Sequence, residues 1–514
     1  MFSKVKSCAV HGVDGRMIDV EADVNDGLPV FTMVGYLSSS VRESSERVRT
    51  ALKNSGFHLP PKRITINLSP ADMRKDGSGY DLAIATAVLL SLGVTAELPM
   101  EQTLVLGELS LDGSIKAIPG VLPMVICARE EGMTSCIVPK ENVQEAALVQ
   151  GISVIGVSSL KETMEYIQGI KEYENTNVEQ PAVDTSEYLY DIDFSDVVGQ
   201  ESIKRGMEIA AAGFHNVLLT GAAGAGKSML AKRLPTILPQ MSFEESLEVT
   251  KIYSVGGMLP PEGGLIHRRP FRAPHHTISE YALIGGGRVP TPGEVSFAHY
   301  GVLFLDELPE FSKPVLEVLR QPLEDRRIRI SRVQASYEFP ADFMFVAAMN
   351  PCPCGNYPDY RRCSCTEQQI RRYQGKVSGP LLDRIDIRME VKGVKQEVLF
   401  SKQKTESSKT IRARVEQARQ MQKERFAGTG LLFNSQLDGK NLEEYITLSE
   451  EGKRLVLQLF EEQELSVRGV HRVLKLARTI ADLAGSEEIE NAHLQEAAFY
   501  RNQDVFAKGV LYGN

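Results

Sequence analysis

Residues 221–228 read Gly221-Ala222-Ala223-Gly224-Ala225-Gly226-Lys227-Ser228, which fits the phosphate-loop pattern G-x-x-x-x-G-K-[ST] at every fixed position. The apolar run 217–220 predicts a strand before the loop, and residues 228–234 predict a helix after it. Such a turn aims backbone N–H groups and a helix N-terminus at one point, which suits a triphosphate. We expect the ammonium group of Lys227 to contact the β- and γ-phosphates. The predicted nucleotide-binding residues are Gly221, Gly224, Gly226, Lys227 and Ser228.

A second apolar run, residues 301–305, ends in the paired carboxylates Asp306 and Glu307. We expect Asp306 to hold Mg²⁺ through water, with the hydroxyl of Ser228 as a direct ligand. Glu307 would accept the proton of the attacking water. The alternative is a solvated strand end, although a buried-type strand rarely ends in two acids without use. The pair therefore adds ATP hydrolysis with Mg²⁺ to the predicted nucleotide binding.

A third apolar run, residues 343–349, ends at Asn350. In nucleotide-hydrolysing motors of this plan, a polar residue at that place orients water against the γ-phosphate. The alternative for Asn350 is a plain turn residue. We expect the catalytic role.

Length and composition limit the classes of protein to be considered. A chain of 514 residues predicts several domains, and 42% apolar with 24% charged residues is ordinary for a globular protein. The net charge of −9 means that contact with nucleic acid needs a local basic surface. The N-terminal residues 1–6 lack an apolar signal core, and the apolar runs are too short to span a bilayer. We therefore expect a cytoplasmic location and no membrane partner.

The chain divides into segments of different character, and the fold class expected is a multidomain α/β protein. Residues 1–170 alternate short β-like runs with helical stretches, which predicts one α/β domain. Residues 171–192 are polar and acidic and predict a linker. Residues 193–395 form a second α/β region around the phosphate loop, and residues 396–514 are charged and predominantly helical.

The stretch between Ser228 and Asp306 is rich in glycine and proline and far longer than one helix needs. Within it, residues 268–276 read RRPFRAPHH and end in His275 and His276. A histidine pair beside arginines allows a metal site, but no third ligand is near in the sequence. We therefore expect a structural or subunit-contacting loop.

Four of the seven cysteines form two C-x-C pairs, Cys352 with Cys354 and Cys363 with Cys365. Four thiolates at this spacing can complete a tetrahedral zinc site with no open position, and such a zinc ion is structural. Clustered cysteines in a reducing compartment favour metal ligands over a disulfide framework. The alternative is a loop that carries four reduced thiols.

Arginine and isoleucine alternate between Arg327 and Ile330, which predicts one strand of a hairpin with basic side chains on one face. Arg327, Arg329 and Arg332 are therefore candidates for contact with nucleic-acid phosphates. The alternative is a solvated, charged hairpin.

These motifs together resemble the AAA+ superfamily, and within it the branch shared by the magnesium-chelatase ATPase subunit and minichromosome maintenance helicases. The resemblance implies an insertion in the helix after the second strand and a hairpin that points into the pore of a ring. It makes Arg384, within the motif GPLLDRID, the arginine finger supplied to a neighbouring subunit, worth ~10³–10⁵ in hydrolysis rate. It also makes Arg468, within LSVRGV, the sensor arginine of a helical lid. The alternative for Arg384 is a local ion pair with Asp383 or Asp386.

Two segments of the first domain, residues 68–83 and 107–120, resemble the catalytic region of Lon-type proteases, whose fold is ribosomal S5-like. On this resemblance, the nucleophile position falls on Gly79 and the position of the lysine base falls on Leu122. A serine without a nearby amine base is a poor nucleophile, so we expect a Lon-like fold without peptidase activity. Two nearby residues are assigned loop or helix-capping roles, Ser78 and Lys75.

The order of a Lon-like domain, a chelatase-type AAA+ core and a C-terminal helical lid resembles the YifB/ComM family over essentially the whole chain. The resemblance implies a homo-hexameric ATPase with ATP, Mg²⁺ and structural Zn²⁺. It further implies a DNA branch-migration helicase that acts on branched or single-stranded DNA in natural transformation or repair, with recombination proteins as further partners. The alternative is a remodelling ATPase that acts on a protein partner.

Overall fold

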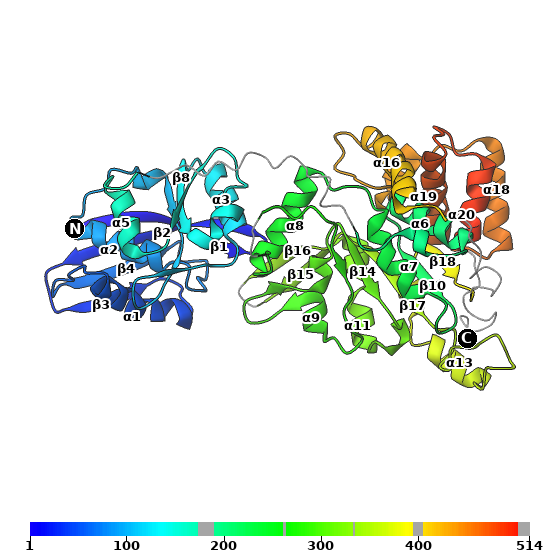
Figure 1. Cartoon of the computed structure of the whole chain (residues 1–514), viewed down its shortest axis with the longest axis horizontal. Helices are drawn as coiled ribbons and strands as arrows, with labels where there is room; N and C mark the ends of the chain where they lie inside the picture. Colours follow the sequence, from blue (N-terminus) through cyan, green and yellow to red (C-terminus); the bar gives the residue numbers. More distant parts are fainter. Residues whose placement is uncertain (173–189, 261–263, 333–334, 394–404, 502–514) are drawn as a thin grey trace.

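The computed structural model describes residues 1–172, 190–260, 264–332, 335–393 and 405–501. Its parts follow one another along the long axis: an α/β domain, a central α/β region and the C-terminal helices (Figure 1). Most of the predicted linker 171–192 and the predicted boundary between residues 395 and 396 lie outside the described residues. None of the described helices has the length and apolar character needed to cross a bilayer.

The first domain is built on a seven-stranded mixed sheet with the order β3-β4-β2-β1-β5-β8-β9. Strand β2 pairs antiparallel with β1 and β4, whereas β5, β8 and β9 run parallel to one another. Helix α2 is apolar on all sides because it is buried between the sheet and helices α1 and α5. The elements are β1 Phe2–His11, β2 Asp14–Asn25, β3 Val30–Val34, α1 Ser39–Asn54, β4 Arg63–Ser69, α2 Asp81–Ser91, β5 Thr103–Val105, β6 Glu108–Leu109, β7 Ile115–Lys116, α3 Val121–Glu130, β8 Ser135–Pro139, α4 Val143–Ala146, β9 Ser153–Val157 and α5 Leu160–Ile167.

The central region is built on a five-stranded sheet with the order β11-β14-β17-β10-β18, in which every neighbouring pair is parallel. Its inner strands are continuous runs of buried residues because helices cover both faces of a parallel sheet. Parallel strands end at one edge, so the segments that follow β10, β14 and β17 lie together. The elements are α6 Glu201–Gly213, β10 Val217–Thr220, α7 Lys227–Arg233, α8 Phe243–Val255, β11 Phe271–Arg272, α9 Glu280–Ile284, α10 Glu294–Phe297, β14 Val302–Leu305, α11 Lys313–Val318, α12 Pro322–Asp325, β17 Met344–Met349, α13 Glu367–Gln374, α14 Gly379–Leu382 and β18 Ile387–Glu390.

Two hairpins project from the central region. Strand β12, Gly285–Gly286, pairs with β13, Thr291–Pro292, inside the glycine-rich insertion. Strand β15, Arg327–Ser331, pairs antiparallel with β16, Ser336–Pro340, so the hairpin predicted from the alternation of arginine and isoleucine is present.

The C-terminal helices share one apolar core with the central sheet. Helices α16 and α19 pack against α6 (Figure 1). Side chains from all three helices belong to the same buried cluster. The helices are α16 Ser408–Arg425, α17 Gly439–Tyr445, α18 Glu450–Glu462, α19 Val467–Leu483 and α20 Asn491–Arg501.

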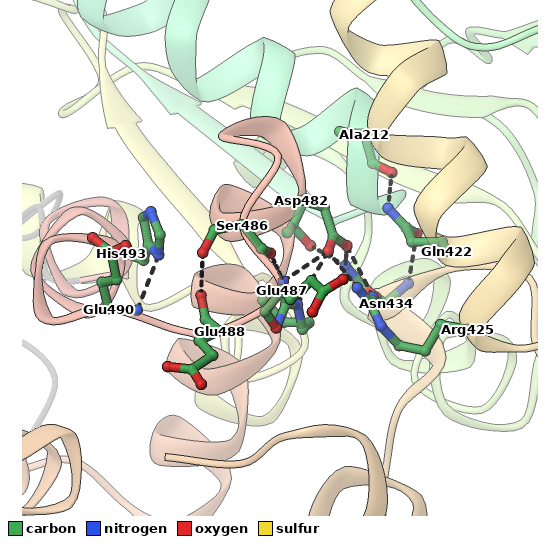
Figure 2. A network of polar contacts seen from close by, with 12 residues as sticks. Ala212, Gln422, Arg425, Asn434, Asp482, Ser486, Glu487, Glu488, Glu490 and His493 are labelled. Atoms are coloured by element: carbon green, nitrogen blue, oxygen red, sulfur yellow. Dashed lines mark hydrogen bonds and ion pairs between the residues drawn. The ribbon is translucent and has the colours of Figure 1, made fainter. Parts of the chain in front are cut away.

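A polar network, seen in Figure 2, secures the same junction. Asp482 on α19 accepts hydrogen bonds from Arg425 (2.5 and 3.0 Å) and from the side chain of Asn434 (2.7 Å). Gln422 on α16 donates to the backbone oxygen of Ala212 on α6 at 3.0 Å. These buried polar side chains are therefore paired where α16 and α19 lie near α6.

The first domain contacts the central region at two places. Helix α3 packs on α8, where the Ser254 hydroxyl donates to the buried Glu145 carboxyl at 2.7 Å and burial raises the pKa of Glu145. At the second place, the ring of His11 stacks on Tyr337 of the β15–β16 hairpin, with 4.5 Å between ring centroids. The hairpin therefore lies between the first domain and the central sheet.

Candidate nucleotide site and neighbouring surfaces

The phosphate loop joins β10 to α7 and depends on its glycines. Gly224 and Gly226 adopt left-handed backbone conformations with φ of 77° and 95°, which cost a residue with a side chain more than glycine. A Cβ atom at Gly221 would lie 2.2 Å from the carbonyl oxygen of Val391, so no side chain fits there. The three glycines of the motif are thus required by the shape of the loop.

The ends of three neighbouring strands bring the predicted catalytic residues together. The Lys227 ammonium group donates to the loop oxygen of Gly221 at 2.7 Å and to Oδ1 of Asn350 at 3.0 Å. The Ser228 hydroxyl donates to Oδ2 of Asp306 at 2.5 Å. A hydroxyl beside a carboxylate offers the oxygen ligands that Mg²⁺ prefers. Burial lowers the pKa of Lys227, and the attraction of Asp306 opposes this shift.

Glu307 follows these residues at the end of β14 and leaves the strand with a left-handed backbone, φ 53° and ψ 46°. Its side chain is 58% exposed, and its Oε2 atom lies 3.8 Å from Nδ1 of His276. An exposed carboxylate at this edge can accept a proton from water.

The two predicted arginines lie together at the opposite edge of the sheet. Arg384 and Arg468 line a cavity of about 260 Å³ beside Asn216, the residue that precedes β10. Arg384 is held in place by Glu324 and by the backbone oxygens of Arg320 and Pro380. The alternative for Arg384 was a local ion pair, and such an ion pair is present. Its partner, however, is Glu324 and not Asp383 or Asp386.

Asp386 instead belongs to a buried group behind the cavity. Its carboxylate accepts from Arg472 at 2.5 Å and from the backbone N–H of Asn216 at 3.0 Å. Burial alone would raise the pKa of Asp386, but Arg472 and His215 outweigh it and hold the pKa far below its usual value. This carboxylate therefore stays ionised and fixes Arg472 beside Arg468.

The β15–β16 hairpin exposes the three candidate arginines, but their charge is partly neutralised. Glu338 on β16 pairs with Arg327 at 2.8 Å and with Arg329 at 3.1 Å, because the register places Arg329 opposite Glu338. Arg332 donates to the Tyr281 hydroxyl at 3.3 Å and to the Gly287 oxygen at 3.2 Å. Arg332 thus joins the hairpin to the glycine-rich insertion.

The sulfur atoms of Cys352, Cys354, Cys363 and Cys365 all lie within 4.8 Å of one another. The separations are 3.4 Å from Cys352 to Cys354, 3.7 Å from Cys352 to Cys363 and 3.6 Å from Cys354 to Cys363. Tetrahedral zinc with bonds of about 2.3 Å requires sulfurs about 3.8 Å apart, so the four thiols fit that metal. A hydrogen bond from the backbone of Asn356 lowers the pKa of Cys354 to about 6. At Cys363, a backbone hydrogen bond from Cys365 is outweighed by burial and by the thiols of Cys354 and Cys352, which raise the pKa to about 12.

The cysteine loop lies beside the phosphate loop. A Cβ atom at Gly355 would be 3.4 Å from the Ala223 nitrogen and 3.9 Å from Cγ of Asn350. A metal in this loop would therefore order one wall of the nucleotide site.

In the first domain, Ser78 and Lys75 make separate contacts. The Ser78 hydroxyl donates to Glu108, and the buried Lys75 ammonium group donates to the oxygens of Pro70 and Met73. Helix α2 has no side-chain cap, so of the two expected roles for Ser78, loop or helix capping, the structure fits the loop role, with Glu108 as the partner.

The sequence matches three family models that together span most of the chain. They are magnesium chelatase, subunit ChlI, over residues 193–399; subunit ChlI of Mg-chelatase, over residues 20–142; and the magnesium chelatase subunit ChlI C-terminal model, over residues 405–501. With the phosphate loop and the parallel sheet, these matches define a magnesium-chelatase-type AAA+ protein.

Full-length relatives narrow this class. Protein YifB of Escherichia coli is 41% identical over 506 residues, covering 98% of this chain and 97% of that protein. Competence protein ComM of Haemophilus influenzae is 40% identical over 503 residues, covering 97% of each. Lon protease 2 of Bacillus subtilis is 30% identical over 183 residues, which is 32% of each chain. The chain belongs to the YifB/ComM family.

Three contacts at these sites were missed from the sequence: His276 with Glu307, Glu324 with Arg384, and Glu338 with two arginines. Of these contacts, only that of Glu338 could have been expected from the sequence. Side chains alternate between the two faces of a strand, so the residue after Tyr337 lies on the face that carries the arginines. The other two partners are distant in sequence, and β11, which positions His276, is only two residues long.

Proposed function

We propose that this protein is an ATP-driven, ring-shaped DNA motor that acts as a branch-migration helicase on recombination intermediates, in natural transformation or DNA repair. The similarity to competence protein ComM supports the choice of process. The proposal rests chiefly on one observation, the position of Arg384 and Arg468 at the edge of the sheet opposite the phosphate loop.

The distance between these edges argues for assembly. Strand β10 runs from Val217 to Thr220, with Asn216 at the cavity and Gly221 in the phosphate loop. Five steps of about 3.3 Å place these two residues roughly 16 Å apart. The arginines of one chain therefore lie far from its own phosphates and would complete the site of a neighbouring copy. A closed ring, which we propose to be a homo-hexamer, gives every copy such a neighbour.

Each residue has a defined role in the proposed reaction. Lys227 and the loop glycines bind the phosphates of ATP, and Ser228 and Asp306 bind Mg²⁺. Glu307 takes the proton of the attacking water, which Asn350 orients. From the neighbouring copy, Arg384 and Arg468 stabilise the charge that develops on the γ-phosphate.

The proposed DNA contacts are made by the β15–β16 hairpin. Arg327 and Arg329 alternate on one face of β15, and the side chains of Arg327, Arg329 and Arg332 are all exposed, as phosphate binding requires. Branched or single-stranded DNA would pass these side chains, and recombination proteins are the expected further partners.

Structural zinc and an inactive first domain complete the proposal. Zn²⁺ held by the four cysteines would fix the loop beside Asn350. Residues 1–170 would keep a Lon-like fold without peptidase activity, residues 193–395 would form the motor core and residues 396–514 a helical lid. The separate contacts of Ser78 and Lys75 support the absence of a serine–lysine pair.

One observation favours a second candidate function. Because Glu338 pairs with both Arg327 and Arg329, the hairpin attracts phosphate less than its sequence suggests. A remodelling ATPase that acts on a protein partner needs no basic hairpin.

Steady-state ATP hydrolysis with and without four-way or forked DNA separates the two functions. We expect DNA to stimulate hydrolysis, Arg327→Ala with Arg329→Ala to weaken that stimulation, and Glu338→Gln to strengthen it by freeing both arginines. Stimulation by unfolded protein but by no DNA would support the remodelling ATPase. A protein that remains monomeric with ATP and DNA and hydrolyses no ATP would contradict both.

A further inference from the structure

The segment between the two C-x-C pairs, residues 355–362, carries an exposed aromatic ring next to two exposed arginines, and we call it the loop tip. The ring is that of Tyr360, which is 76% exposed, and the arginines are Arg361 and Arg362. Neither the reaction nor the hairpin contacts described above use these side chains. Building on the proposed function, we propose that the loop tip is a second DNA contact, which stacks an unpaired base on Tyr360 and binds the adjoining phosphates through Arg361 and Arg362.

The backbone gives the loop tip a compact shape. The sulfur atoms of the four cysteines lie within 4.8 Å of one another, so the two ends of the tip meet. The backbone N–H groups of Arg362 and Cys363 donate to the carbonyl oxygen of Asp359, at 3.0 and 2.8 Å. The N–H group of Arg361 donates to Oδ1 of Asp359 at 3.0 Å. Residues 360–362 therefore form a tight turn, and all three of their side chains are exposed.

Tyr360 offers an open ring face on which a base can stack. Its ring meets that of Tyr357 edge to face, with 5.8 Å between centroids and 84° between planes. This geometry covers at most one face of Tyr360. Tyr357 is itself held in place, because its backbone N–H donates to Sγ of Cys352 at 3.4 Å. An exposed aromatic ring stacks on unpaired bases of any sequence, whereas the bases of a duplex are already stacked on one another. The partner that fits is therefore single-stranded DNA.

The arginines of the loop tip are less neutralised than those of the β15–β16 hairpin. Among the residues that the structure describes, none forms an ion pair with the side chain of Arg361. The side chain of Arg362 is 79% exposed, and its carboxylate partner Asp359 is 3.8 Å away. In the hairpin, by contrast, Glu338 lies 2.8 and 3.1 Å from two arginines. The loop tip thus offers phosphates a positive charge that nearby acids cancel less.

The two proposed DNA contacts lie in different parts of the central region. Helix α13 begins at Glu367, directly after the cysteine loop, and lies at the side of the central region away from the first domain (Figure 1). The β15–β16 hairpin lies on the side that meets the first domain, where His11 stacks on Tyr337. Distant sites contribute independently to binding, so losses of affinity at the hairpin and at the loop tip should add as free energies.

A fluorescence titration tests the stacking directly. The chain contains no tryptophan, so Tyr360→Trp gives the full-length protein a single tryptophan at the proposed contact. We expect single-stranded oligo(dT) to quench its emission, because a base stacked on the indole ring deactivates the excited state, and a duplex of equal length to leave it unchanged. The matched control is Phe2→Trp, at an exposed position of the first domain, whose emission should not change. Anisotropy of labelled oligo(dT) reports binding by the whole protein.

Affinities separate the roles of the ring and the arginines. Tyr360→Ala should weaken oligo(dT) binding on the order of tenfold, whereas Tyr360→Phe, which keeps the ring, should bind as the wild type does. Arg361→Ala with Arg362→Ala should reduce the slope of log affinity against log salt by about 0.7 for each arginine lost. Arg49→Ala, which removes an exposed arginine of α1, should leave that slope unchanged.

Unchanged emission from Tyr360→Trp while the protein binds oligo(dT) would overturn the inference and leave the proposed function intact. A wild type that binds neither single-stranded nor branched DNA would contradict the proposed function and the inference with it. If the loop-tip variants lose affinity only because they no longer assemble, as mass photometry would show, the tip contacts another copy of the chain and the inference is wrong. Thermal unfolding identifies a variant whose loss of binding reflects a damaged fold, and for such a variant the emission of Tyr360→Trp decides.

Discussion

The two edges of the central sheet carry unlike sets of charged residues. At the carboxyl edge, Lys227 contacts Asn350 and Ser228 contacts Asp306. At the amino edge, Arg384 and Arg468 border an open cavity, and the positive charge of Arg384 is balanced by Glu324. In the proposed reaction, the carboxyl edge binds the nucleotide and the amino edge supplies positive charge. The proposal therefore requires that each copy of the chain complete the site of the next, and the predictions below test that requirement.

The largest effect is expected when two inactive variants are mixed, which tests whether the two edges act in different copies of the chain. Lys227→Ala should abolish ATP binding, and Arg384→Ala should lower hydrolysis by ~10³–10⁵-fold with binding retained. Combined in one assembly, the two should recover part of the wild-type rate, because an intact carboxyl edge then meets an intact amino edge. Steady-state ATPase activity at several mixing ratios measures this recovery.

If mixtures of the two variants stay inactive at every ratio although mixed assemblies form, both halves act within one chain. The appropriate control mixes Lys227→Ala with Lys227→Ala, Arg384→Ala. In that mixture no intact carboxyl edge is present and no recovery is expected.

A substitution confined to the carboxyl edge sharpens the comparison. Glu307→Gln should lower kcat by about 10²–10⁴-fold, since proton acceptance is lost while the phosphate loop is untouched. ATP affinity, measured with a fluorescent nucleotide, should remain near that of the wild type. Hydrolysis at the parental rate would show that another group accepts the proton.

The smallest expected effect concerns the metal beside the carboxyl edge. The wild type should contain one zinc ion per chain, and Cys352→Ser with Cys365→Ser should contain none. ATP affinity should fall only moderately, because the loop next to Asn350 loses order while the phosphate loop persists. Elemental analysis decides the question, and equal zinc content in both proteins would exclude the four-cysteine site.

The carboxyl edge was largely predictable because Lys227 and Ser228 belong to a recognisable loop motif, while Asp306 and Asn350 directly follow apolar runs. Short-range patterns of this kind identify a strand and the polar residue at its end. The partners at the amino edge were not predictable, since Glu324 and Arg384 are 60 residues apart and Asp386 and Arg472 are 86 apart. Only the tertiary fold brings such charges together.

The fold, too, was predictable where the sequence has a regular local pattern and unpredictable where it depends on distant pairing. Alternating β-like and helical runs gave the α/β character of the first two parts and the helical character of the last. The two-residue strand β11 left no periodic signal, and with it the histidine pair was assigned to a loop without reference to Glu307. The basic face of the hairpin was predicted from β15, but its neutralisation depends on the register of β16.

The apolar face shared by α6, α16 and α19 bears on how the protein can be cut into pieces for study. Helix α6 ends at Gly213, whereas α16 begins at Ser408. A fragment that ends between the central region and the C-terminal helices would therefore expose this apolar face to water. Such a truncation invites aggregation. A fragment that contains the central region should therefore keep the C-terminal helices, a design rule for expression and crystallisation.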